Sequence, residues 1–94
     1  VVRRGSLELV SAADARHILL VCEAREVTVL GLEGFRTDGA AIVPEMSAIA
    51  DYSEAFKGSP DRSRETVACA RRFLDAMTDS QLLFELVYAI QEDD

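Results

Sequence analysis

The pattern of hydrophobic and polar residues predicts four strands and two helices along the 94 residues of this chain. The first apolar run, residues 7–10, has the length of a short strand. Ser11 then offers a helix cap, and Asp14 places an acid in the first turn, where the helix dipole favours it. The helix extends to about residue 25, and its apolar face consists of Ala15, Ile18, Leu19 and Cys22. Leu20 and Val21 widen that face, so we expect this helix to be covered on more than one side.

The middle of the chain predicts a β-hairpin. Residues 27–32 are rich in β-branched residues and leucine and are apolar on both faces, which is typical of a central strand. Gly31 within this run indicates a bulge or the close approach of another backbone. Asp38-Gly39 precedes a further apolar run, residues 40–43, and this dipeptide indicates a hairpin with a type I′ turn. Pro44 lacks an amide hydrogen, so it either ends the third strand or places that strand at an edge.

The second half of the chain predicts one more helix and one more strand. Residues 46–56 fit a helix and an extended chain equally well. Ser59 followed by Pro60 predicts a helix start, Ser63 offers a rival start one turn later, and the helix ends near residue 77. Residues 82–90 alternate as a strand, with Phe84, Leu86, Tyr88 and Ile90 on one face and Leu83, Glu85, Val87 and Ala89 on the other. We expect residues 91–94 to form a frayed polar tail.

This β-α-β-β-α-β order predicts a single α+β domain over residues 1–94. It is the order of a ferredoxin-like sandwich, in which two helices cover one face of an antiparallel sheet. In that arrangement the first and third strands are central and the second and fourth are edges, which conflicts with the central character of residues 27–32. The alternative is another small α+β sandwich in which residues 46–56 form a third helix.

Composition narrows the class of protein. No apolar run approaches the roughly 18–20 residues that cross a bilayer, and residues 1–10 lack a signal-peptide pattern, so we expect a cytoplasmic protein with no membrane partner. The net charge of −7 argues against nucleic-acid binding, which needs clustered Lys and Arg. Cys22 and Cys69 lie far apart within helices, so we expect buried, reduced thiols.

Residues that carry catalysis or hold a metal are scarce. His17, the only histidine, is expected to be a structural or exposed residue. No Cys or His cluster has zinc spacing, no serine lies in a nucleophile elbow, and residues 31–34 do not form a phosphate loop. With 17 acids, a pair such as Glu33 and Glu45 is weak evidence for acid–base catalysis. The sequence therefore predicts neither an enzyme nor a metal or cofactor site.

The acids are distributed unevenly along the chain. Residues 33–54 hold five acids against the single base Arg36, and residues 75–94 hold six acids and no base, whereas the second helix carries arginines. A segregated negative face steers a basic protein partner, while an evenly spread acid excess serves only solubility. The candidate partner-binding residues are Glu33, Asp38, Glu45, Asp51, Glu54 and Glu85.

Two segments, residues 27–35 (VTVLGLEGF) and residues 84–87 (FELV), look like pieces of small bacterial proteins. In size and acidity the chain is similar to the bacterial immunity proteins and antitoxins that neutralise basic nuclease toxins. The resemblance implies a type of function only, in which acids block the basic active site of a toxin. It assigns no role to any particular residue.

Three functions remain open from the sequence. The first is a non-catalytic protein-binding module, in particular an immunity- or antitoxin-like inhibitor of a basic partner such as a nuclease toxin. The second is a homodimeric or larger structural or regulatory domain, because an apolar edge strand such as residues 82–90 invites pairing. The third is a small metabolite-binding protein with a pocket between the first helix and the hairpin.

Overall fold

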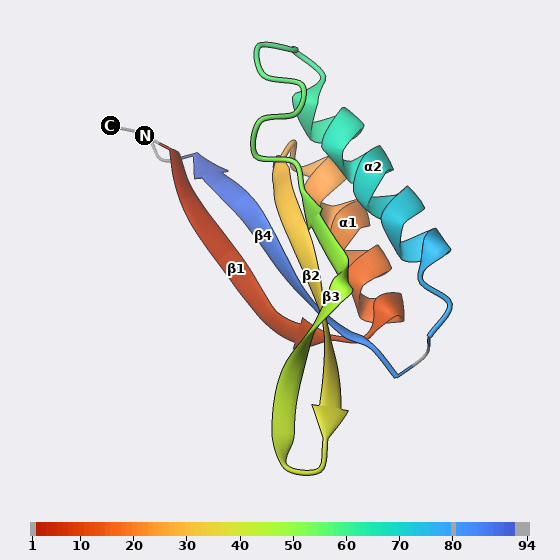
Figure 1. Cartoon of the computed structure of the whole chain (residues 1–94). Helices are drawn as coiled ribbons and strands as arrows, with labels where there is room; N and C mark the ends of the chain where they lie inside the picture. Colours follow the sequence, from red (N-terminus) through yellow and green to blue (C-terminus); the bar gives the residue numbers. More distant parts are fainter. Residues whose placement is uncertain (1, 80, 92–94) are drawn as a thin grey trace.

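The computed structural model describes the backbone of residues 2–79 and 81–91 and the side chains of residues 9–79 and 81–89 (Figure 1). The elements are β1 (Val2–Val10), α1 (Ala12–Ala24), β2 (Val29–Asp38), β3 (Ala41–Asp51), α2 (Arg62–Ala76) and β4 (Leu83–Gln91). The strands form one antiparallel sheet, and both helices lie on the same side of it (Figure 1). The α+β class with two helices on an antiparallel sheet is therefore confirmed. Residues 92–94 of the predicted tail lie outside the described residues.

The strand order across the sheet is β1-β4-β2-β3, so β4 and β2 are central and β1 and β3 are edges. A ferredoxin-like sandwich would place the first and third strands in the centre, so the expected assignment of central and edge strands is wrong. The central position predicted for residues 27–32 from their apolar character is correct. Residues 82–90 do not form an edge, because Leu86 lies opposite Leu7 on one side and Leu32 on the other. The prediction that this strand pairs between molecules therefore loses its basis.

The core lies between the sheet and the two helices. Its largest fully buried side chains include Leu19 of α1, Leu74 of α2, Leu32 of β2, and Phe84 and Leu86 of β4. The helical face predicted for α1 is confirmed at its buried positions, Ala15, Leu19 and Cys22. Leu20 and Val21 are 56% and 43% exposed, so the expectation that α1 is covered on more than one side is wrong. The sheet and α2 contact one side of α1 and leave these two residues at the surface.

The two helices begin in different ways. In α1, Ser11 Oγ accepts a hydrogen bond from the Asp14 amide at 3.1 Å, as predicted. In α2, the cap residue is Asp61, which lies between the two predicted starts. Ser59 Oγ accepts a hydrogen bond from the Asp61 amide at 3.2 Å and donates one to Glu65 at 2.9 Å. Ser59 therefore closes a turn ahead of the helix instead of capping it.

Polar contacts join the first turns of α2 to the start of β2. The buried Thr66 Oγ1 accepts a hydrogen bond from the Val29 amide at 3.2 Å and donates one to the Ser63 carbonyl at 3.1 Å. Ser63 Oγ donates to the Val27 carbonyl at 2.8 Å. These bonds satisfy backbone groups at the point where β2 enters the sheet.

The hairpin between β2 and β3 is confirmed, although its turn differs in type. The strands end at Asp38 and resume at Ala41, so the loop is Gly39-Ala40. Of these two loop residues, Gly39 alone has a positive φ, +62°. A type II′ turn requires a positive φ at its first loop position, whereas a type I′ turn requires it at both. Residues 46–51 continue β3 and residues 53–56 form turns, so the extended interpretation is correct for residues 46–51 and no third helix forms over residues 46–56.

Two glycines of β2 allow β3 to approach closely. A Cβ atom at Gly31 would lie 2.6 Å from the Ala50 carbonyl oxygen, and one at Gly34 would lie 2.7 Å from the Ala48 Cβ. The close backbone approach predicted at Gly31 is therefore confirmed. The register between β2 and β4 shifts next to Gly31, and the register between β2 and β3 shifts next to Gly34.

The end of the hairpin projects beyond the rest of the sheet (Figure 1). Pairing between β2 and β4 ends where Phe35 lies opposite Leu83, whereas β2 and β3 stay paired as far as the turn. We call residues 36–43 the hairpin arm. Its Ile42 and Val43 are 56% and 44% exposed because no third strand or helix covers a two-stranded ribbon.

Candidate functional site

The structure divides the six predicted acids by the groups that they contact. Glu45 and Glu54 form ion pairs within the chain, and Asp51 bonds within its own turn. Asp38 is exposed at the tip of the arm. Glu33 and Glu85 lie opposite each other on the sheet.

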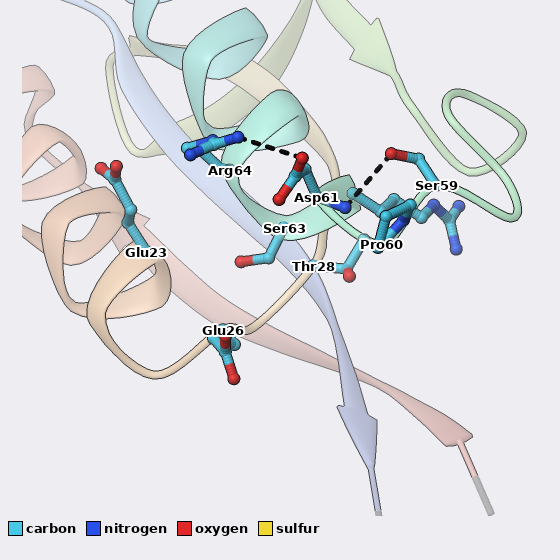
Figure 2. Close-up of a pocket in the computed structure, with 9 residues that line it drawn as sticks. Glu23, Glu26, Thr28, Ser59, Pro60, Asp61, Ser63 and Arg64 are labelled. Atoms are coloured by element: carbon cyan, nitrogen blue, oxygen red, sulfur yellow. Dashed lines mark hydrogen bonds and ion pairs between the residues drawn. The ribbon is translucent and has the colours of Figure 1, made fainter.

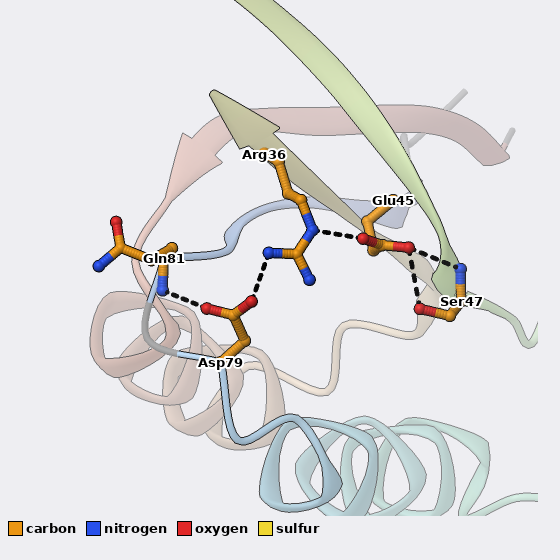
Figure 3. A network of polar contacts seen from close by, with 5 residues as sticks. All are labelled: Arg36, Glu45, Ser47, Asp79 and Gln81. Carbon is orange, nitrogen blue, oxygen red and sulfur yellow. Dashed lines mark hydrogen bonds and ion pairs between the residues drawn. The ribbon is translucent and has the colours of Figure 1, made fainter. Parts of the chain in front are cut away.

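Arg36 connects the hairpin arm to the loop before β4 (Figure 3). Its guanidinium pairs with Glu45 through Nε and with Asp79 through Nη1. Ser47 Oγ also donates to Glu45, at 3.0 Å, and the Gln81 amide donates to Asp79 at 2.9 Å. Hydrogen bonds from Arg36 and Ser47 lower the pKa of Glu45, and those from the Gln81 amide and Arg36 lower the pKa of Asp79. Glu45 therefore stabilises the arm, and its charge is already compensated.

Glu54 and Asp51 also bond locally. Lys57 Nζ lies 2.7 Å from the Glu54 carboxylate, three residues earlier in the chain. Asp51 accepts a hydrogen bond from the Ser53 amide at 2.8 Å and so stabilises the turn that follows β3. Both acids lie at the end of β3 and do not join a common patch with Asp38, which is at the opposite end of the same strand pair.

Glu33 and Glu85 form a cross-strand pair on the two central strands. The adjacent Leu32 and Phe84 are buried against the helices, so both carboxylates point to the face of the sheet that no helix covers. Both side chains are partly buried, and no described residue forms a hydrogen bond or an ion pair with either carboxylate. Like charges at directly opposite positions destabilise a sheet, on the scale of about 0.2–1 kcal/mol per pair.

A pocket of about 400 Å³ lies beside this pair on the uncovered face. Each strand contributes one lining residue, namely Leu9, Phe35, Ile42 and Glu85. Three of the four are apolar, so the pocket combines hydrophobic walls with one carboxylate and lies next to a second, Glu33. We call these five residues the open-face site.

Glu33 and Glu85 of the open-face site are among the acids predicted from the sequence as partner-binding residues, whereas its apolar residues were not among the predicted ones. The predicted alternation along β4 is confirmed, since Phe84 and Leu86 are buried and Glu85 lies on the other face. Phe35 is two residues after Glu33, so the same period of two was a signal that both share a face. Leu9 and Ile42 had no such signal, because their position depends on the strand order and on the course of the hairpin arm.

A larger cavity of about 600 Å³ lies between the end of α1 and the start of α2 (Figure 2). Its lining carries both charges, and several of its polar groups bond within the protein. Arg64 pairs with Asp61 at 3.0 Å, and Arg62 donates to the carbonyl oxygens of Ser53 and Ala55 at 2.7 and 3.0 Å. These contacts fasten the loop after β3 to α2. Neither cavity lies between α1 and the hairpin, where a metabolite pocket was expected.

The arginines of the helices do not form a separate positive face. Arg16 of α1 pairs with Asp75, and Arg71 of α2 lies 3.3 Å from Glu23. Each of these two arginines is therefore paired with an acid of the other helix, and the expected segregation of charge does not hold at these positions. On the sheet, by contrast, the carboxylates of the open-face site lack a described counter-ion.

The remaining candidate groups do not form a second site. Both cysteines are free; Cys22 is buried, which raises the pKa of its thiol, and Cys69 is partly exposed. His17 is exposed on α1. Within the described ranges, no three His, Cys, Asp or Glu side chains gather as a metal ion would need, and no helix has the length and hydropathy to cross a bilayer.

Comparison of the chain with protein-family models, with characterised proteins and with solved structures found no match.

Proposed function

We propose that this protein is a non-catalytic binding module that holds a basic partner protein on the uncovered face of its sheet. In the sharpest form of the proposal, it inhibits that partner as immunity proteins and antitoxins inhibit basic nuclease toxins. The observation that carries the proposal is the pair Glu33 and Glu85, two carboxylates directly opposite each other with no counter-ion among the described residues.

The pair is unfavourable in the isolated protein and becomes favourable in a complex. Mutual repulsion across the strands destabilises the sheet, and a cation from a partner would remove it. The apolar neighbours Phe35 and Ile42 would exclude water from the contact and so strengthen the attraction between the charges. The net charge of −7 would in addition speed the approach of a basic protein at low salt.

The test compares two double variants that remove the same formal charge. Glu33→Gln/Glu85→Gln changes the open-face site, whereas Glu54→Gln/Asp61→Asn changes two acids that lie elsewhere and pair with Lys57 and Arg64. Basic proteins retained from host lysate by the unmodified chain are purified, and their affinities for all three proteins are measured at low and high salt. We expect the first variant to bind at least about tenfold more weakly, a loss of about 1.4 kcal/mol, and the second to change little. Equal losses in both variants, or affinity independent of salt, would contradict the proposal.

A homodimer remains the second candidate, and the exposed apolar residues of the edge strand β3 favour it. Met46 is 76% exposed, Ile42 56% and Ile49 42%. Pro44 and the shift of register between β2 and β3 oppose simple edge-to-edge pairing, because both interrupt the row of free amides. Light scattering over a range of concentrations decides between the candidates. A monomer at every concentration excludes the dimer, and a dimer that Met46→Glu dissociates supports it.

A further inference from the structure

We infer that the pocket of the open-face site receives an arginine side chain of the partner. The inference rests on the proposed function and makes it specific, because it names the chemical group that the site recognises. It starts from the composition of the pocket, in which Leu9, Phe35 and Ile42 provide apolar walls and Glu85 provides the charge.

The ligand must match both the walls and the carboxylates. A small anion is repelled, and a purely apolar group would leave two partly buried carboxylates with no counter-ion among the described side chains. A long cationic side chain fits both features, since its methylene stem packs on apolar surface while its charged end reaches the acids. With a volume of about 400 Å³, the pocket is in the lower part of the range of roughly 300–1,000 Å³ that is usual for ligand sites.

Two features favour arginine over lysine. Glu33 and Glu85 present two carboxylates side by side on adjacent strands, and a planar guanidinium has several donors with which to engage both. The ring of Phe35 lines the same pocket, and guanidinium groups stack on aromatic faces more often than ammonium groups do. Arginine is also the more weakly hydrated of the two cations, so it loses less on entering a partly apolar pocket.

A metal ion is a poorer match to the same residues. Divalent cations bound by oxygen take several ligands, and the pocket supplies one carboxylate from its lining and one beside it. The other three residues of the open-face site are apolar and offer no side-chain oxygen.

The probes for the test are N-acetylarginine amide, N-acetyllysine amide and N-acetylcitrulline amide, the last being a neutral isostere of arginine. Each is titrated into the isotopically labelled 94-residue chain, and the backbone amide shifts are followed by NMR. We expect saturable shifts centred on residues 33–35, 42 and 85, with a dissociation constant on the order of millimolar for arginine, weaker binding for lysine and no saturation for citrulline. Shifts that citrulline reproduces, or that spread evenly over all exposed acids, would overturn the inference.

Matched variants test the two parts of the pocket separately. Glu85→Gln is expected to abolish saturable binding of the arginine probe. Phe35→Leu keeps an apolar wall and removes the ring, so we expect binding roughly two- to fivefold weaker. Glu54→Gln is the control and should bind as the unmodified chain does, and the amide spectra show directly whether each variant is folded.

The outcomes separate this inference from the proposed function. If the arginine probe occupies the pocket but no basic protein binds, the pocket assignment stands and the proposed function fails. If a basic partner binds with an affinity that Glu85→Gln and Phe35→Leu leave unchanged, the function stands and the arginine pocket is wrong. Shifts centred on the cavity between α1 and α2 would likewise exclude the open-face site.

Discussion

Glu33 of β2 and Glu85 of β4 lie directly opposite each other in the centre of the sheet, on the face that the helices leave uncovered. Arg36, three residues further along β2, pairs with Glu45 and Asp79 instead of with either member of this pair. The guanidinium of Arg36 thus stabilises the hairpin arm. It does not compensate the charges of Glu33 and Glu85, so these two carboxylates repel each other.

Removal of one charge from this pair is therefore expected to stabilise the protein. Glu33→Gln or Glu85→Gln should raise the free energy of unfolding by about 0.2–1 kcal/mol, because the cross-strand repulsion disappears. Urea denaturation at low salt measures the difference, which should shrink as salt screens the charges. Glu54→Gln is the matched control and should not stabilise, since it loses the ion pair with Lys57. A loss of stability in both central variants would show that the carboxylates already have partners.

The contacts of Arg36 predict how stability depends on pH. Hydrogen bonds from Arg36 and Ser47 lower the folded-state pKa of Glu45 below its ordinary value of 4.5, and those from the Gln81 amide and Arg36 lower the pKa of Asp79 below 3.8. Because the folded-state pKa is lower than the unfolded-state pKa, the unfolded chain takes up protons at a higher pH than the folded chain does. The stabilisation from these contacts is therefore complete above the ordinary pKa values, and it is lost as the pH falls through the folded-state pKa values. Arg36→Gln should therefore destabilise the protein near neutral pH and have progressively less effect in acid. Thermal unfolding of both proteins across this range, with Arg25→Gln as a control for charge, would reveal a pH-independent difference if the prediction were wrong.

Gly34 is expected to reject a side chain unless β3 makes room for it. Gly34→Ala would place a Cβ 2.7 Å from the Cβ of Ala48, and we expect a loss of roughly 1–3 kcal/mol in the free energy of unfolding. Ala48→Gly removes the obstructing atom, so the double variant should be less destabilised than the sum of the two single variants. Denaturant titrations of the four proteins complete the cycle. Strict additivity would mean that the strands do not approach as closely as the structure shows.

Thr66 is expected to be more sensitive to the loss of its hydroxyl than to the loss of its methyl group. Thr66→Val keeps the shape of the buried side chain but leaves the Val29 amide without its acceptor, which should cost about 1–3 kcal/mol. Thr66→Ser keeps the acceptor and should cost less. Chemical denaturation ranks the two variants, and hydrogen exchange at the Val29 amide should become faster in Thr66→Val alone. Equal losses would indicate that packing, not the hydrogen bond, is decisive at this position.

The two free thiols should react at very different rates. Cys69 is partly exposed on α2, whereas Cys22 is buried and its pKa is raised by that burial, so little of it is thiolate. We expect iodoacetamide to modify Cys69 first under native conditions and Cys22 only when the protein unfolds. Mass spectrometry of peptides from timed samples measures both rates, with a sample in denaturant as the reference. Similar native rates would place Cys22 near the surface.

Local patterns predicted most of the elements of this fold but not their arrangement. The Ser11 cap, the buried face of α1, the hairpin and the alternation along β4 all follow from residues close together in sequence, since caps, turns and side-chain periods are short-range properties. The two predicted caps of α2, Ser59 and Ser63, each lie two residues from the observed cap, Asp61. The side chain of Ser59 bonds to Glu65 in the first turns of the helix, and the sequence pattern does not distinguish this contact from a cap.

The acidity and the number of residues of each type were determined by the amino-acid sequence itself, because charge and residue type do not depend on folding. Which acids are compensated was decided only by the tertiary structure. Arg36 reaches Asp79 across 43 positions of the chain, and Glu33 meets Glu85 only because β4 inserts between β1 and β2. Strand order follows from how the apolar faces of all six elements are buried together, which is a property of the whole molecule. The open-face site, with one pocket residue from each strand, exists only as a result of that packing.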